Sequence, residues 1–123
     1  MDLSAFQKLD RVIHEKGRFA IMAALAPVES LTFKEMKDLL GMTDGNLSVH
    51  MRTLEENRYV HVDKVFVERK PRTTYSLTSE GRRAFAEYIE TLESIIQHSR
   101  AVAPQPRRKA PAGGPLPSPT AAE

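Results

Sequence analysis

Three basic side chains, Arg69, Lys70 and Arg72, occur within four positions and surround Pro71. Proline restricts the unfolded backbone, so this segment can present its positive charges at a low entropic cost. Such a cluster can bind the phosphates of a nucleic acid, and Lys64 is expected to add to the same surface. A basic loop can also serve only to keep a protein soluble, and that alternative stays open.

A second group of polar side chains lies in the segment 43–57 and has residue types that can contact DNA bases. If Leu47 and Met51 face a core, a helical rotation of about 100° per residue turns Val49 and Arg52 outward. Arginine can bind guanine, asparagine can bind adenine, and valine can contact the thymine methyl group. We expect DNA contacts from Thr43, Asn46, Ser48, Val49, His50, Arg52 and Thr53, with Ser48 and His50 on phosphates. A merely solvated helix face is the alternative.

Residues for other kinds of chemistry are sparse. The chain has no cysteine, which excludes disulfides, thiolate metal sites and a cysteine nucleophile. His61 and Asp63 share one face of a predicted strand, but two ligands are too few for a tight metal site. No glycine-rich phosphate loop, catalytic carboxylate pair or nucleophile–base arrangement is recognisable. We therefore expect no metal, no cofactor and no enzymatic activity.

The overall charge says less than its placement. The 123 residues include 18 basic and 16 acidic ones, for a formal net charge of +2. The last 20 residues hold three of the basic and one of the acidic residues, so residues 1–103 carry no net charge. No apolar run approaches the roughly 20 residues of a membrane span, and the N-terminus does not resemble a signal peptide. We expect a cytoplasmic protein.

Two predicted helices precede the polar segments. The first is indicated by Leu3, Phe6, Leu9 and Ile13, and the second by Phe19, Met22, Leu25 and Ala26, with Pro27 closing it. Gly17 is expected to mark a break between them. Thr32 and Glu35 then form a capping-box pattern at the start of a helix that ends at Gly41. Thr43 is a second N-cap, so residues 32–57 predict two short helices joined by a tight turn.

The remainder of the ordered chain predicts a hairpin and a long helix. Two segments rich in β-formers, 59–68 and 73–77, flank the polar loop 69–72. A helix-turn-helix followed by a hairpin with a basic tip is the winged-helix order, with residues 68–73 as the wing. Thr78 or Ser79 caps a helix over about 80–102, whose apolar stripe is formed by Phe85, Ile89, Leu92 and Ile96 and widened by Tyr88 and Ile95.

These segments resemble compact winged-helix transcriptional regulators related to the MarR and ArsR groups. The likeness extends from about Leu9 to Phe85 and is most specific in TDGNLSVH and KPRTTYSLTSEG. It implies a homodimer that places the second helix of the helix-turn-helix in the major groove and the wing along the backbone or minor groove. The sequence departs from the family at Met51, where leucine is usual, and at Arg58, where glycine is usual.

The expected fold is therefore α+β and mostly helical: a winged helix-turn-helix with a two-stranded wing and a long C-terminal dimerisation helix. Residues 1–103 form the expected domain. Residues 104–123 hold six of the eight prolines and almost no core residues, which predicts a disordered tail. The expected dimer interface comprises Leu3, Phe6, Leu9, Ile13, Phe85, Tyr88, Ile89, Leu92, Ile95 and Ile96. Burial of the stripe within one chain is the alternative.

The function expected from these observations is a homodimeric, sequence-specific transcriptional regulator, acting as a repressor by occlusion. Its partners would be a second copy of the chain and double-stranded DNA with a palindromic site. A winged helix used only for protein–protein contacts is the alternative, and the neutral charge of residues 1–103 gives it some weight. The sequence does not indicate an effector.

Overall fold

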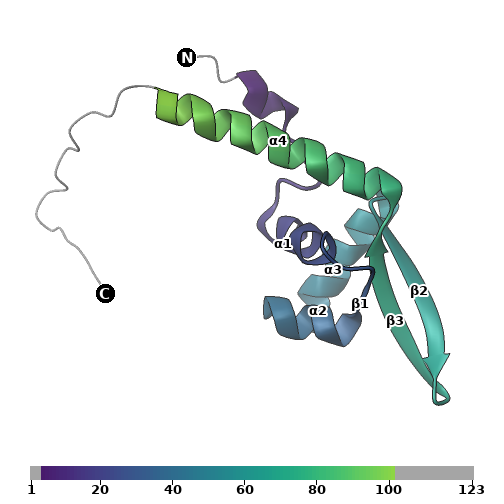
Figure 1. Ribbon diagram of the computed structural model, residues 1–123. Helices are drawn as coiled ribbons and strands as arrows, with labels where there is room; N and C mark the ends of the chain where they lie inside the picture. Colours follow the sequence, from purple (N-terminus) through teal and green to yellow (C-terminus); the bar gives the residue numbers. More distant parts are fainter. Residues whose placement is uncertain (1–3, 102–123) are drawn as a thin grey trace, which may run out of the picture.

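The computed structural model describes residues 4–101, and its helices pack together at the base of a long β-hairpin (Figure 1). The elements in chain order are the 3-10 helix η1 (Ser4–Lys8), α1 (Lys16–Leu25), β1 (Leu31–Thr32), α2 (Phe33–Leu40), α3 (Asp44–Glu56), β2 (Val60–Val67), β3 (Lys70–Leu77) and α4 (Ser79–Ala101). This is the predicted winged-helix order. Leu3 and the expected tail 104–123 lie outside the described residues.

The helix-turn-helix is built by local capping interactions. Thr32 and Glu35 form the predicted capping box, in which each side chain accepts a hydrogen bond from the other residue's backbone amide. α2 ends at Gly41, whose φ of 67° lies in the left-handed region that glycine adopts without strain. Thr43 then caps α3 by accepting from the amide of Asn46 at 3.1 Å. The turn between the two helices is therefore short and well defined.

The sheet has three strands in the order β1-β3-β2, because β1 pairs with β3 at Leu31 and Thr32. β2 and β3 pair antiparallel along their full length, from Val60 opposite Leu77 to Val67 opposite Lys70. Only Glu68 and Arg69 connect them, with φ angles of 54° and 68°. Two left-handed residues make the turn that matches the twist of a hairpin.

This turn corrects the expected wing loop. The prediction of a polar loop over 69–72 is wrong, because residues 70–72 belong to β3 and pair with residues 65–67. Pairing satisfies the backbone groups of the segment, and the proline is tolerated because β1 does not extend this far along β3. The basic side chains therefore stand on a regular two-stranded ribbon.

The N-terminal segment also differs from expectation. A continuous helix through Leu3, Phe6, Leu9 and Ile13 is wrong: only Ser4–Lys8 is helical, and it is a 3-10 helix. The carboxylate of Asp10 accepts from the amides of Val12 at 2.8 Å and Ile13 at 3.2 Å. A side chain that binds nearby amides in this way competes with helix formation. The expected break between the two apolar segments lies at residues 9–15, just before Gly17, which is in the first turn of α1.

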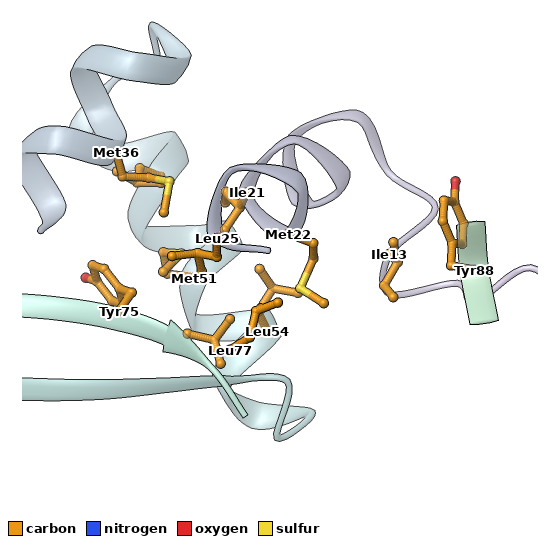
Figure 2. Close-up of a cluster of buried hydrophobic side chains, with 12 residues drawn as sticks. Ile13, Ile21, Met22, Leu25, Met36, Met51, Leu54, Tyr75, Leu77 and Tyr88 are labelled. Atoms are coloured by element: carbon orange, nitrogen blue, oxygen red, sulfur yellow. The ribbon is translucent and has the colours of Figure 1, made fainter. Parts of the chain in front are cut away.

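The core joins the helices to the base of the hairpin (Figure 2). Its buried side chains are Ile13, Ile21, Met22, Leu25, Met36, Leu47, Met51, Leu54, Val60, Tyr75, Leu77 and Tyr88. Phe19 extends the core towards α4, with its ring centroid 6.0 Å from that of Phe85 and 5.7 Å from that of Tyr88. Within residues 4–101, no helix is long and apolar enough to cross a membrane.

Candidate nucleic-acid interface

One side of α3 is buried and the other faces solvent. Leu47 and Leu54 are fully buried and Met51 is 3% exposed, as their helical spacing predicts. Val49 is 58% exposed, and Arg52 is exposed on the same side. Gly45, Asn46 and Ser48 in the first turns are also exposed. The outer face of α3 thus presents the guanidinium group of Arg52, the side-chain amide of Asn46 and the apolar side chain of Val49 to a partner.

The first turn of α3 carries an acidic residue whose charge is balanced. Asp44 accepts a salt bridge from Lys37 of α2, with Nζ and Oδ1 2.8 Å apart. This hydrogen bond, reinforced by the charge of Asp44, raises the pKa of the Lys37 ammonium group. Because Lys37 offsets the carboxylate, the repulsion that Asp44 would exert on an approaching phosphate is reduced.

His50 turns back towards α1. Its side chain is 19% exposed, and its Nδ1 lies 3.6 Å from Oε1 of Glu15 and 3.5 Å from a terminal nitrogen of Arg18. The ring also lies so close to Gly17 that a Cβ atom there would be 2.7 Å from it. The structure thus places His50 between α1 and α3, and the phosphate contact expected for it stays a prediction.

Three polar side chains of α1, α3 and the residue before α1 are held by hydrogen bonds within the chain. Arg18 donates from Nε to the carbonyl oxygen of Val12 at 2.6 Å, which anchors the segment before α1. Thr53 donates to the carbonyl oxygen of Val49 at 3.2 Å. Glu15 caps α1, and the hydrogen bond from the amide of Arg18 lowers the pKa of this carboxyl group. Burial opposes that shift, while the charges of His50 and Arg18 add to it.

The hairpin carries the expected cations in exposed positions. Lys64 lies on β2, Arg69 in the turn, and Lys70 and Arg72 on β3. Within the described part of the chain, the ion pairs do not involve any of these four residues. Figure 1 shows the tip of the hairpin projecting beyond the helices. Its positive charges are therefore available to a partner.

The turn between α3 and β2 fixes the position of the hairpin relative to α3. Arg58 adopts a φ of 66°, in the left-handed region that glycine adopts at less cost. Its carbonyl oxygen accepts from the hydroxyl of Thr78 at 2.6 Å, and the amide of Thr78 donates to the carbonyl of Tyr59 at 3.0 Å. The hydroxyl of Tyr59 donates to the carboxylate of Asp10. The turn is thereby attached both to the start of α4 and to the N-terminal segment.

Three contacts made by this turn and by the start of α4 were not anticipated from the sequence. The first is the hydrogen bond between Asp10 and Tyr59, and the second is the close approach of Gly81 to Tyr59. In the third, Arg82 donates hydrogen bonds to the carbonyl oxygens of Ala26 at 2.9 Å and Val28 at 3.2 Å. A conspicuous glycine in the first turn of α4 was the one available signal. The other contacts join residues about 50 positions apart, which local patterns do not reveal.

The expected dimer interface is only partly exposed. Ile13 is fully buried and Tyr88 is 5% exposed within the single chain, so both are removed from the set of interface candidates. Their burial follows from packing between the N-terminal segment, α1 and α4, where Nδ1 of His14 lies 2.7 Å from the Tyr88 hydroxyl. Phe6 is 55% and Ile96 45% exposed. The partly buried members are Leu9, Phe85, Ile89, Leu92 and Ile95.

His61 and Asp63 are exposed on β2, as their alternation requires. Among residues 4–101, no group of three or more histidine, aspartate or glutamate side chains is arranged to hold a metal ion.

Comparisons with known proteins identify related chains. Residues 18–96 match the family model described as a winged helix DNA-binding domain. An uncharacterized protein from Methanocaldococcus jannaschii is 34% identical over 92 residues, which cover 75% of this chain and 97% of that protein.

Two solved structures extend this similarity to the fold. A transcriptional regulator homologue from Pyrococcus horikoshii is 28% identical, with a TM-score of 0.74, and the match covers 81% of this chain and 99% of the other. Diamide-treated YodB from Bacillus subtilis has a similar fold, at 22% identity and a TM-score of 0.63, with 70% of this chain and 84% of the other covered.

Proposed function

The chain belongs to the family of winged helix DNA-binding domains, and we propose that it is a transcriptional regulator that binds specific sites in duplex DNA. The observation that supports this function is the outer face of α3, where Val49 and Arg52 are exposed opposite a fully buried apolar stripe. The hairpin that follows α3 carries the exposed cations and projects past the helices (Figure 1). An exposed helix face together with a basic ribbon suits a duplex, because bases and phosphates can be contacted together.

In this proposal α3 enters the major groove and the hairpin lies along the backbone or minor groove. Arg52 binds a guanine through two hydrogen bonds, Asn46 contacts adenine, and Val49 contacts a thymine methyl group. Ser48 and Thr43 at the exposed N-terminal end of α3 contact phosphates. Lys64, Arg69, Lys70 and Arg72 neutralise phosphates and supply affinity that does not depend on sequence.

We further propose that the regulator is a homodimer that represses transcription by occlusion. α4 has 23 residues, which corresponds to roughly 35 Å, and its C-terminal half extends past the winged core with η1 beside it (Figure 1). Phe6 and Ile96 are exposed in this region. Apolar side chains exposed together often mark an interface. A symmetric dimer would recognise a palindrome with half-sites about one helical turn apart.

The test begins with selection of bound fragments from a genomic library, which supplies a preferred duplex. Affinity for this duplex and for a scrambled one is then measured against salt concentration. Arg52→Ala should weaken binding to the preferred duplex by about 1–3 kcal/mol and relax the preference at one position per half-site. Neutralising Arg69, Lys70 and Arg72 together should weaken binding to both duplexes. It should also reduce the slope of log affinity against log salt concentration, by up to about 0.9 per lost phosphate contact.

Arg11→Ala provides a matched control, because Arg11 is an exposed arginine outside α3 and the hairpin. It should leave affinity and preference unchanged. Equal weakening of both duplexes by Arg52→Ala would make Arg52 a phosphate contact. If the unaltered protein binds no duplex even at low salt, the winged helix serves protein–protein contacts instead, and the proposed function is wrong.

A further inference from the structure

Phe66 is the most exposed large apolar residue among those described, at 76%. It lies near the tip of the hairpin and pairs across the strands with Pro71. Residues directly opposite each other in an antiparallel pair project from the same face, so the phenyl and pyrrolidine rings are neighbours. The tip thus carries a small apolar platform within a strongly basic segment.

The platform continues the core-facing side of the hairpin. Side chains alternate along a strand, so Phe66 shares a face with Val60, which is 2% exposed against the helices. On β3 the same face includes Tyr75, whose ring lies 6.3 Å from that of Phe33 in α2. Beyond these contacts the hairpin projects past the helices (Figure 1), and Phe66 is the second-to-last residue of β2. The platform therefore faces the side of the molecule on which the helix-turn-helix lies.

The surroundings of Phe66 define the chemistry of its partner. Lys64 lies on the same face, Arg69 is in the adjoining turn, and Lys70 and Arg72 lie on the opposite face of the ribbon. A partner that suits all of them must be anionic and must also accept an aromatic ring. A DNA duplex has both properties, because phosphates line its grooves and a base step that opens can take up an apolar ring.

We propose that Phe66, supported by Pro71, inserts between two base pairs from the minor groove and kinks the DNA. The proposal rests on the function proposed above and extends it from base contacts to DNA bending. Proteins that bend DNA from the minor groove use apolar side chains, phenylalanine and proline among them, as wedges between base steps. Because pyrimidine–purine steps unstack most easily, such a wedge adds a preference at a position that makes no base hydrogen bond.

The experiment measures the bend directly. The preferred duplex, obtained by the selection described above, carries a donor and an acceptor fluorophore at its ends. Binding of the unaltered protein should shorten the distance between the ends and raise energy transfer. Phe66→Ala should bind about fivefold or more weakly, as expected for a lost ring contact, and should leave the duplex straight. It should still discriminate between the preferred and scrambled duplexes through α3.

Two further variants separate the wedge from general effects. Phe66→Leu should retain the bend, because leucine also serves as a wedge. Val67→Ala, a 39% exposed position on the opposite face of the hairpin, should leave bending unchanged. A duplex that bends equally with Phe66→Ala, or that is bound without bending by the unaltered protein, would overturn the wedge and leave the proposed function standing.

A surface of anionic lipids would also combine negative charge with an apolar layer. Sedimentation with vesicles containing phosphatidylserine tests it. Binding of the vesicles that Phe66→Ala abolishes, together with bending that the substitution leaves intact, would assign Phe66 to a membrane and overturn the proposal. Loss of duplex binding at all salt concentrations by the unaltered protein would instead contradict the proposed function itself.

Discussion

Gly81 in the first turn of α4 lies so close to Tyr59 that a Cβ atom at Gly81 would be 2.1 Å from the Tyr59 carbonyl oxygen. The same turn is held by Thr78, whose hydroxyl accepts from the amide of Gly81 at 2.8 Å. The start of α4 is thereby packed directly against the backbone that follows α3. This contact sets the angle at which the long helix leaves the winged core.

Gly81→Ala should therefore destabilise the fold by about 1–3 kcal/mol, because the added methyl group meets backbone that cannot move aside cheaply. Denaturant unfolding measures the loss. Gly45→Ala is the matched control, since nothing lies within 4 Å of a Cβ atom at that helical position. It should stabilise by roughly 0.5–1 kcal/mol. Equal stability of the two variants would show that the contact at Gly81 is not tight.

Arg58→Gly should stabilise the protein by about 0.5–1 kcal/mol. The backbone at Arg58 has a φ of 66°, which costs an ordinary residue about 1–2 kcal/mol but costs glycine nothing. The greater entropy of glycine in the unfolded chain offsets part of that gain. Arg58→Val should have the opposite effect, because a β-branched residue adopts this conformation least readily. Thermal unfolding of both variants tests the prediction, and a lower melting temperature for Arg58→Gly would contradict it.

Tyr59→Phe should destabilise the fold by about 1–2 kcal/mol near pH 8, because it leaves the carboxylate of Asp10 without its hydroxyl donor. Burial, followed by the hydrogen bond to Asp10 and the charge of that residue, raises the pKa of Tyr59 to about 12. The unfolded chain loses the same proton near pH 10. The stabilisation from Tyr59 is therefore complete below pH 10 and disappears as the pH rises towards 12.

The difference in unfolding free energy between the unaltered protein and Tyr59→Phe should accordingly shrink between pH 10 and pH 12. Burial also raises the pKa of Tyr75 and of Tyr88, but both remain in the variant and cancel in the comparison. A difference that stays constant across this range would show that the ionisation of Tyr59 is not linked to folding.

Ile96→Asp should dissociate the proposed homodimer without unfolding the chain. Ile96 is 45% exposed, so a carboxylate there remains hydrated in the monomer but would be buried in an interface. Leu92 is a poorer choice, because it packs partly against the core of its own chain. Arg83→Asp places a carboxylate at an exposed position in the N-terminal half of α4, outside the proposed interface, and should remain dimeric. Sedimentation at micromolar concentration decides, and a monomeric unaltered protein would refute the dimer.

Removal of residues 104–123 should leave the melting temperature unchanged, since their proline-rich composition offers almost no side chains for a core. A loss of several degrees would show that this segment contributes to the fold. Comparison of the full chain with a chain ending at Ala103 measures the effect.

Part of the candidate interface could be predicted because its determinants are local. The outward position of Arg52 follows from the burial of Leu47 and Met51 on the same helix, which a spacing of three and four residues already indicates. The inward turn of His50 could not be predicted in this way. It depends on Gly17, 33 positions earlier, whose missing side chain leaves room for the ring.

The sequence by itself determined the elements whose ends are set by neighbouring residues. Thr32 with Glu35, Gly41 and Thr43 define the helix-turn-helix, because a cap satisfies backbone groups within three or four positions. Only the tertiary structure decided how those elements meet. Its contacts pair β1 with β3, bring His14 against Tyr88, and seat Gly81 on Tyr59. Such contacts join residues distant in the chain, and their energies depend on close approach that no local pattern encodes.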